Sequence, residues 1–240
     1  YRDNAFVTTT WLGNDAVTLL LAVPLLLAAL VFARRGSVRA QLVWLGALDY
    51  MLYNYAFYLF GAAFNAFFLL YAVLMGLSVF ALIFGLASLE VAQFNPQISS
   101  RIPHQWIGGY FLFVAAGLAL VYILQSLVFI TNGQLPAIVT LTQHPTNVVF
   151  ALDLTLLIPW LALGAIWLVQ RRPWGYAIAG ILSVKGPLYT LVLALNSILV
   201  VRVGISETSE LRLWGTLTML GMIASGLFYA NLRKPASTKA

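Results

Sequence analysis

Residues 174–200 read WGYAIAGILSVKGPLYTLVLALNSILV, and this stretch decides how the rest of the chain is interpreted. It is long enough to cross a bilayer, which requires about 20 apolar residues. Lys185 nevertheless lies near its middle, and Gly186-Pro187 follows directly. A lysine at that depth costs about 3 kcal/mol on insertion scales, so a partner is required. The acidic candidates within or at the ends of the long apolar segments are Asp49, Glu90 and Asp153.

The composition indicates a membrane protein. Hydrophobic residues make up 62% of the 240 residues and charged residues only 8%, against about 25% charged residues in an ordinary soluble domain. We therefore predict one all-α domain, residues 1–240, with the lipid bilayer as its solvent. The absence of cysteine excludes disulfides, thiol catalysis and iron–sulfur clusters. The net charge of +6 does not indicate nucleic-acid binding, because the basic residues cluster at the ends of apolar segments.

The apolar segments predict a polytopic bundle of seven transmembrane helices. Each segment is close to the length that a bilayer requires, and no internal repeat is evident. The predicted helices cover about residues 16–33, 40–60, 66–89, 106–130, 148–169, 176–200 and 211–230.

The distribution of basic residues predicts the orientation in a plasma (inner) membrane. If the loop after the first segment is cytoplasmic, nine basic residues lie inside and three outside, as the positive-inside rule requires. The N-terminus is then outside and the C-terminus cytoplasmic. The nine inside residues are Arg34, Arg35, Arg39, Arg101, Arg171, Arg172, Arg233, Lys234 and Lys239, and the three outside are Arg2, Arg202 and Arg212.

Depth in the membrane suggests which buried polar residues meet. Asp49 and Lys185 each lie roughly nine residues from the cytoplasmic end of their segments, about 14 Å at the helical rise. Lys185, Tyr189 and Asn196 share one helical face, as do Asp49 and Tyr53. We predict a polar column that forms a substrate- or ion-binding site, with tyrosines between its inner and outer halves. Its members are Asp49 and Lys185 in the inner half, Asp153, Asn196 and Gln125 in the outer half, and Tyr53 and Tyr189.

Each of these features also has a purely structural interpretation. An Asp49–Lys185 pair could simply fix the register of two helices. Pro187 leaves the carbonyl of Ser183 without its usual helical donor, which predicts a kink and a polar cavity beside Lys185. The same proline could equally form an ordinary packed kink. The small-residue pair Gly221 and Ser225 suits close helix packing, so a homo-oligomer or a partner in a membrane complex stays open.

Several kinds of chemistry lack their residues in this sequence. His104 and His144 fall in loops predicted on opposite sides of the membrane, which excludes paired axial histidines for a transmembrane haem. No glycine-rich phosphate loop, HExxH or GxSxG motif is present, and the carboxylates are not clustered as a di-metal site requires. We predict no cofactor and no metal. Whether the protein is an enzyme stays uncertain, with the balance against it.

Two resemblances accompany these patterns. Seven segments with a buried lysine and carboxylates resemble the retinal proteins, but those carry the lysine on the last helix, whereas here it lies on the sixth. The second resemblance covers Pro145-Thr146-Asn147, Asp153-Leu154, Pro159 and the run RRPWGY at 171–176. These residues are similar to a set of bacterial multi-pass proteins without an assigned function. That resemblance implies a bacterial plasma membrane, and it implies nothing about an activity.

The leading functional hypothesis is a membrane protein that binds or transports a small solute or ion, in one version coupled to protons. Intramembrane ionisable residues are functional candidates by default. The rival hypothesis is a non-catalytic accessory or sensor subunit of a larger membrane complex. A third is an intramembrane enzyme or a retinal-type photoreceptor. Transport predicts a water-accessible cavity near Asp49 and Lys185, whereas the accessory hypothesis predicts a dry, closed pair.

Overall fold

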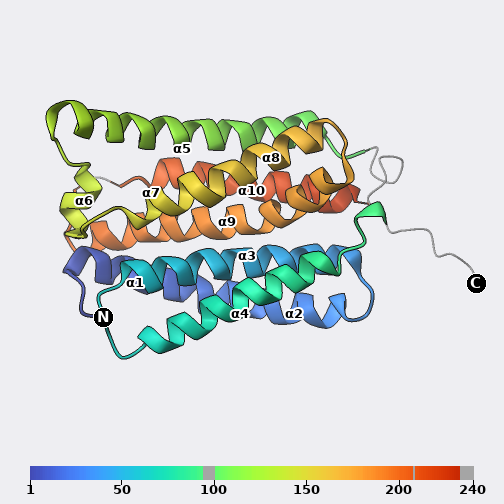
Figure 1. Cartoon of the computed structure of the whole chain (residues 1–240), viewed down its shortest axis with the longest axis horizontal. Helices are drawn as coiled ribbons and strands as arrows, with labels where there is room; N and C mark the ends of the chain where they lie inside the picture. The colour runs from blue at the N-terminus through green and yellow to red at the C-terminus, as the bar shows by residue number, and fades with distance from the viewer. Residues whose placement is uncertain (94–100, 208, 233–240) are drawn as a thin grey trace, which may run out of the picture.

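The computed structural model describes residues 1–93, 101–207 and 209–232, and within these residues all regular secondary structure is helical (Figure 1). The helices run roughly parallel or antiparallel to one another in a single elongated bundle. In chain order the elements are α1 (Ala5–Val17), η1 (Thr18–Ala22), α2 (Val23–Ala33), α3 (Val38–Gly61), α4 (Phe68–Ala87), η2 (Val91–Gln93), α5 (His104–Asn132), α6 (Ala137–Thr142), α7 (Val148–Leu152), η3 (Asp153–Leu157), α8 (Ile158–Val169), α9 (Pro173–Arg202) and α10 (Leu211–Asn231).

Two of the long helices contain a short π-helical segment, and a proline explains each one. The elements α1, η1 and α2 follow one another without a break, as do α7, η3 and α8. Pro24 and Pro159 each lie two residues after their π-helix and have no N–H to donate to the preceding turn. The widened turn instead closes with a bond five residues back, from Val23 to Thr18 and from Ile158 to Asp153.

Six helical stretches are long and apolar enough to cross a membrane. They run over Ala5–Ala33, Phe68–Ala87, His104–Asn132, Val148–Val169, Pro173–Arg202 and Leu211–Asn231. The prediction of an all-helical, membrane-type bundle is confirmed at this level. The remaining predicted span corresponds to α3, a helix of 24 residues that is not among the six. It carries Arg39, Asp49, Asn54 and four tyrosines, which lower its mean hydropathy.

The first helix begins at Ala5, well before the predicted start at residue 16. Asn4 caps it by accepting a hydrogen bond from the backbone N–H of Val7. The hydroxyls of Thr9 and Thr10 donate to backbone carbonyls of the preceding turn. These polar side chains are therefore satisfied inside a helix, in a stretch that lies before the first predicted span.

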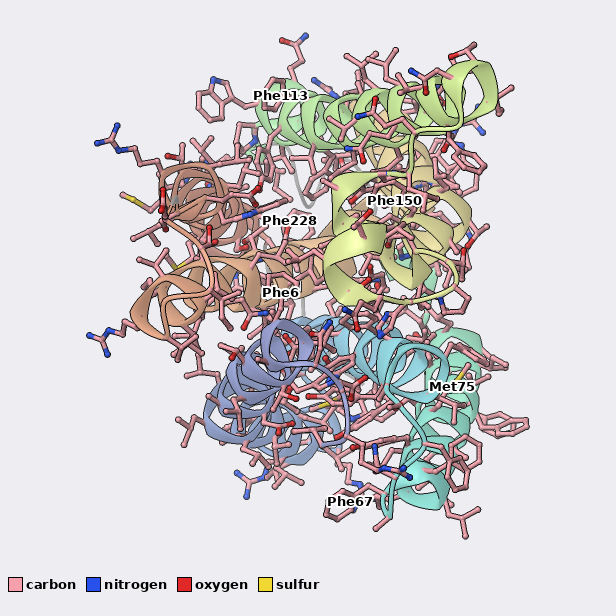
Figure 2. The ribbon with its side chains drawn as sticks, turned by 90° about the vertical axis from the view of Figure 1, so that its left-hand side faces the viewer. Phe6, Phe67, Met75, Phe113, Phe150 and Phe228 are labelled. Carbon is pink, nitrogen blue, oxygen red and sulfur yellow. The ribbon has the colours of Figure 1, made fainter. Side chains whose placement is uncertain are left out.

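Burial separates an inner helix from an outer layer. In the apolar stretch of α9, 67% of the residues are buried, against 11% in the corresponding stretch of α5. Helices α3, α8 and α10 pack directly on α9. Seen along the bundle, Phe113 of α5 and Phe67 beside α4 point outward, while Phe228 of α10 lies among the helices (Figure 2). An outer layer of exposed apolar side chains around a buried centre is the pattern expected when lipid is the solvent.

One end of the bundle is basic. The turns α2–α3 and α8–α9 and the start of α5 lie together at the end opposite the N-terminus (Figure 1). They carry Arg34, Arg35, Arg101, Arg171 and Arg172, with Arg39 in the first turn of α3. Arg233, Lys234 and Lys239, which the orientation argument also used, lie outside the described residues.

Candidate functional site

Asp49 and Lys185 form a buried ion pair between α3 and α9. Lys185 Nζ lies 3.0 Å from Asp49 Oδ1, and both side chains are at least nine-tenths buried. The two helices approach closely because Gly46 has no side chain. A Cβ built there would lie 2.6 Å from the backbone oxygen of Ile181 on α9. The predicted equal depth of the two charges thus corresponds to a direct contact.

Tyr53 connects this pair to a second carboxylate. It lies one turn after Asp49 on α3, and its ring has Lys185 Nζ 5.0 Å from its centroid, a cation–π arrangement. Its hydroxyl donates to Asp153 Oδ1 at 2.7 Å and also lies 3.2 Å from the hydroxyl of Tyr189. One side chain therefore contacts the lysine with its ring face and the second acid with its hydroxyl.

Asp153 is completely buried and has no cationic partner among the described residues. It is the first residue of η3 and is 0% exposed. Its Oδ2 accepts a hydrogen bond of 2.7 Å from Tyr122 on α5, in addition to the bond from Tyr53. The charge of Lys185 acts on Asp153 only from a distance, because the ion pair of that lysine is with Asp49.

We call the six residues that make these contacts the charged cluster. When all three ionisable groups are charged, it contains two carboxylates and one ammonium group. Asp49 Oδ2 is also buried and has no hydrogen-bond partner in the part of the chain that the structure describes. The cluster therefore carries one negative charge in excess, together with one unused acceptor. Its members are Asp49, Tyr53, Tyr122, Asp153, Lys185 and Tyr189.

A second network, the neutral cluster, lies between α1, η1, α3 and α9. Asn196 donates to Asn14, Asn14 donates to Asn54, and Asn54 donates to Thr18, over 3.1–3.4 Å. The Thr18 hydroxyl also bonds to that of Tyr50 at 2.9 Å. All five residues are buried. Because these side chains are amides and hydroxyls, the cluster satisfies most of its polar groups without any charge.

The seven residues predicted for one polar column are thus divided. Asp49, Lys185, Tyr53, Asp153 and Tyr189 come together in the charged cluster. Asn196 belongs instead to the neutral cluster, because α1 extends far enough to bring Asn14 beside it. Gln125 is half-buried on α5, and no described residue of either cluster is hydrogen-bonded to it.

Sequence reasoning omitted Tyr122, Asn14 and Thr18 from the site. Tyr122 is polar and deep in an apolar segment, but nothing in the sequence shows that its helix lies against Asp153. Asn14 was assigned to the segment before the first helix. The spacing of Asn14 and Thr18, four residues apart, was the available signal, because it places both on one helical face.

The carbonyl that Pro187 leaves without a helical donor has a partner on a neighbouring helix, while the cavity expected beside Lys185 stays a prediction. The Ser183 carbonyl, which Pro187 leaves without its helical donor, accepts from the hydroxyl of Ser225 on α10. The same hydroxyl also bonds to the carbonyl of Gly221. A neighbouring helix thus satisfies the freed group, one of the ways in which membrane helices tolerate an internal proline.

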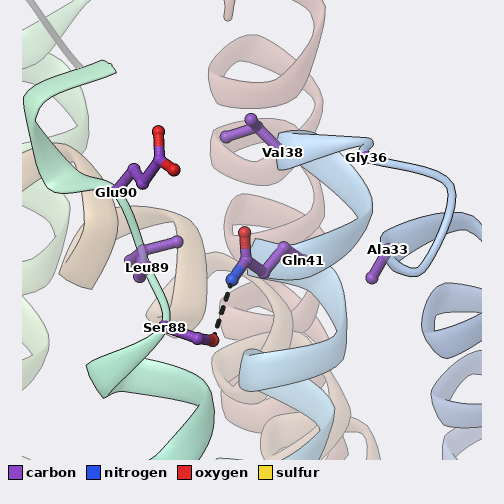
Figure 3. A pocket seen from close by; sticks show the side chains of 7 residues that line it. All are labelled: Ala33, Gly36, Val38, Gln41, Ser88, Leu89 and Glu90. Atoms are coloured by element: carbon purple, nitrogen blue, oxygen red, sulfur yellow. Dashed lines mark hydrogen bonds between the residues drawn. The ribbon is translucent and has the colours of Figure 1, made fainter.

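The charged cluster is closed in this structure. Neither of two surface pockets reaches it. A pocket of about 190 Å³ lies at the basic end between the α2–α3 turn and the end of α4, where Gln41 donates to Ser88 (Figure 3). A larger one, of about 750 Å³, is lined by residues 133–143 around α6. Asp49, Asp153 and Lys185 are all buried, so the cluster is closed to solvent in this structure.

The N-terminal segment is fastened by two further acids at the end opposite the arginines. Asp3 accepts from the indole N–H of Trp11 and from the backbone N–H of Ala63, and it lies 3.7 Å from His144. Asp15 accepts from Tyr1 and from Tyr58 on α3. Burial and the neighbouring Asp15 carboxylate raise the pKa of Tyr1, which keeps this phenol as a donor.

The histidines stand apart from the charged cluster. His104 bonds to the hydroxyl of Tyr176 at 2.7 Å near the basic end, and His144 faces Asp3 at the other end. Across the described residues, no three His, Asp or Glu side chains gather closely enough to hold a metal ion.

No protein-family model, curated protein or solved structure matches this chain. The resemblance to bacterial multi-pass proteins stays a prediction. The site is therefore interpreted from its own geometry.

Proposed function

We propose that the chain crosses a bacterial plasma membrane seven times. The six apolar stretches form six of these spans, and α3, which is second in chain order, forms the additional one. A helix of 24 residues is long enough to cross. Helices α2, α4 and α9 pack on α3, which supports a position among spanning helices for its polar residues. The arginines gathered at one end support a cytoplasmic location for that end, with the N-terminus outside.

We further propose that the protein binds and transports a small solute or ion through the charged cluster. The observation that carries this proposal is the excess buried carboxylate, Asp153, held 0% exposed without a cation of its own. One ion pair is sufficient to fix helix register, and apolar residues of similar volume often stabilise a core as well or better. A second buried acid adds cost without adding register, so a role in ligand or proton binding accounts for it.

In this mechanism the observed structure is the occluded state. The Asp49–Lys185 pair joins α3 to α9, and Tyr53 joins that pair to η3 through Asp153. Neutralising Asp153, or bringing an anion to Lys185, weakens these connections. The helices α1–η1–α2 and α7–η3–α8, each widened by a π-helical segment, are the elements suited to respond, because their widened turns contain fewer regular helical bonds.

The second candidate is an accessory or sensor subunit of a membrane complex, and the closed state of the cluster favours it. In that case the charged cluster stays dry and serves only packing. An enzyme site combining Asp153 with His144 has no geometric support, because His144 faces Asp3 and Asp153 is surrounded by tyrosines.

Cysteine accessibility separates the two candidates, since the chain contains no cysteine of its own. Val184, which contacts Gly46 beside the ion pair, is replaced by cysteine and exposed to a membrane-impermeant thiol reagent in proteoliposomes. Ala179→Cys, in the apolar core, is the unlabelled control, and Leu135→Cys, on an exposed loop, is the labelled control. Transport predicts labelling of Val184→Cys as the site opens to water. If it is as inert as Ala179→Cys, the accessory function replaces this proposal.

A further inference from the structure

The same order of elements occurs twice in the bundle. A helix interrupted by a five-residue π-helix is followed by two uninterrupted helices, first in α1–η1–α2, α3 and α4, then in α7–η3–α8, α9 and α10. Helices α5 and α6 lie between the two sets in sequence. Both sets run in the same direction along the bundle (Figure 1).

Short sequence features also correspond between the two sets of helices. The first π-helix and its proline read TLLLAVP at 18–24, and the second read DLTLLIP at 153–159. In each set the helix that contains the π-helical segment ends near a pair of arginines, Arg34-Arg35 and Arg171-Arg172, and a tight turn leads to the next helix. Few side chains are identical, which is why no repeat is evident from the sequence.

Packing corresponds as well. In the first set α2 and α4 pack on α3, and in the second set α8 and α10 pack on α9. The two central helices, α3 and α9, pack on each other. The first parts of the two π-containing helices pack on the central helix of the other set, so that α1 packs on α9 and α7 packs on α3. This exchange is what a two-fold rotation about an axis between α3 and α9 produces.

The residues on that axis can be identified. Under two-fold symmetry a residue meets its own equivalent only at the axis. Asp49 meets Lys185 and Tyr53 meets Tyr189, and in both pairs the residues are 136 positions apart. Two contacting pairs with the same separation fix the register of α3 against α9. The axis runs along the helices, as in transporters built from parallel repeats.

We infer that the bundle consists of two copies of one three-helix unit. Within it, Asp153 is the group that binds and releases the proton that is transported or coupled to transport. This rests on the proposed function and names the ligand of the same site. The first residue of each π-helix is Thr18 in one copy and Asp153 in the other. Thr18 is neutral and bonds to Tyr50 and Asn54. The second copy thus places a carboxyl where the first has a hydroxyl.

The groups around Asp153 favour a proton over a metal cation. The hydroxyls of Tyr53 on α3 and Tyr122 on α5 donate to Asp153. From α9, Lys185 acts on Asp153 through its charge, and Tyr189 is connected to Asp153 by its hydrogen bond to Tyr53. Two hydroxyls are far fewer than the six to eight oxygen ligands that a hard cation such as Ca²⁺ takes. A single proton also removes the single excess charge of the cluster.

The protonation step involves one bond. The carboxylate of Asp153 takes one proton from water, an O–H bond forms on a carboxyl oxygen, and the cluster becomes neutral. Tyr53 can then turn its own proton from Asp153 toward Tyr189, since either hydroxyl of that pair can donate. Release reverses these changes and returns the proton to water.

Infrared titration of the purified full-length protein in detergent tests the proton site. A protonated carboxyl has its own C=O stretching band. Exposed carboxyls titrate near pH 4, so a band that changes with pH well above that value reports a buried acid. We expect such a band in the parent protein and in Asp15→Asn, and its loss in Asp153→Asn. If Asp153→Asn does not fold, Asp153→Thr, which carries the residue of the equivalent position, takes its place.

A parent protein without this band, or a band that persists in the folded Asp153 variant, overturns the proton site. Cysteine labelling of Val184→Cys is independent of this result, so failure of the proton site is distinguishable from failure of the proposed transport.

Charge reversal on the axis tests the duplication. Because Asp49 and Lys185 occupy equivalent positions, Asp49→Lys combined with Lys185→Asp restores the pair with its two members exchanged. We expect the double variant to unfold near the parent midpoint, while Asp49→Lys and Lys185→Asp alone unfold much earlier. A double variant as unstable as the two single variants would contradict the two-fold arrangement.

Discussion

The charged and neutral clusters occupy the same bundle and connect many of the same helices, yet they differ in one physical respect. In the neutral cluster, Asn196 donates to Asn14, Asn14 to Asn54 and Asn54 to Thr18, and the Thr18 hydroxyl bonds to that of Tyr50. The charged cluster contains two carboxylates and one ammonium group, and among the described residues that ammonium group pairs only with Asp49. A neutral network has nothing to exchange with water, whereas a cluster with unequal charges changes its energy with every proton or ion that arrives. Burial alone therefore does not identify a functional site in this bundle.

The largest expected difference between the clusters follows from removing one member of the ion pair. Lys185→Met strands the carboxylate of Asp49 in a buried position and should lower the free energy of unfolding by about 3–5 kcal/mol. Asp49→Asn, which strands the lysine, should also destabilise, and combining the two should recover much of the loss. Thermal or chemical unfolding in detergent measures all three. Single variants as stable as the parent would show that the two charges do not depend on each other.

Tyr53→Phe separates the ring of Tyr53 from its hydroxyl. The ring still covers Lys185, but Asp153 loses a hydrogen bond to a charged acceptor, which should cost about 1.5–3 kcal/mol. The matched control is Tyr229→Phe, whose hydroxyl donates to the backbone carbonyl of Gly180 and should cost about 1 kcal/mol. Chemical unfolding compares them. Equal losses would mean that Asp153 does not carry a charge in the folded state.

Gly46→Ala tests the close approach of α3 to α9 that the charged cluster needs. The added methyl would meet backbone of α9, which cannot rotate away, so a loss of about 1–3 kcal/mol is expected. Gly76→Ala on α4 has open space around it and should gain up to about 1 kcal/mol from helix propensity. A shift of the same sign in both variants, measured by thermal unfolding, would argue against the tight contact.

The smallest effect is expected in the neutral cluster. Asn196→Ala removes one neutral hydrogen bond, to Asn14, and should cost about 1 kcal/mol. It should leave the infrared carboxyl band and the labelling of Val184→Cys unchanged. Loss of either signal in this variant would place the neutral cluster within the functional site and remove the distinction between the charged and the neutral cluster.

Much of the architecture was predictable from local patterns. Long apolar runs and basic turns place most helices near their observed positions, because length and hydropathy are local properties. The start of the first helix was not predictable in this way, because Thr9 and Thr10 are polar but bond to carbonyls of their own helix. Depth counting brought Asp49 and Lys185 to the same level, because the rise of a helix is constant.

The sequence by itself therefore determined the class of bundle, the common level of Asp49 and Lys185 along their helices, and the need for a partner to Lys185. Only the tertiary structure decided which helices are neighbours. That choice puts Tyr122 on Asp153, assigns Asn196 to Asn14, and brings residues 136 positions apart into contact. The reason is physical: hydropathy and helical rise act along one segment, whereas lateral packing depends on the shapes of all segments together.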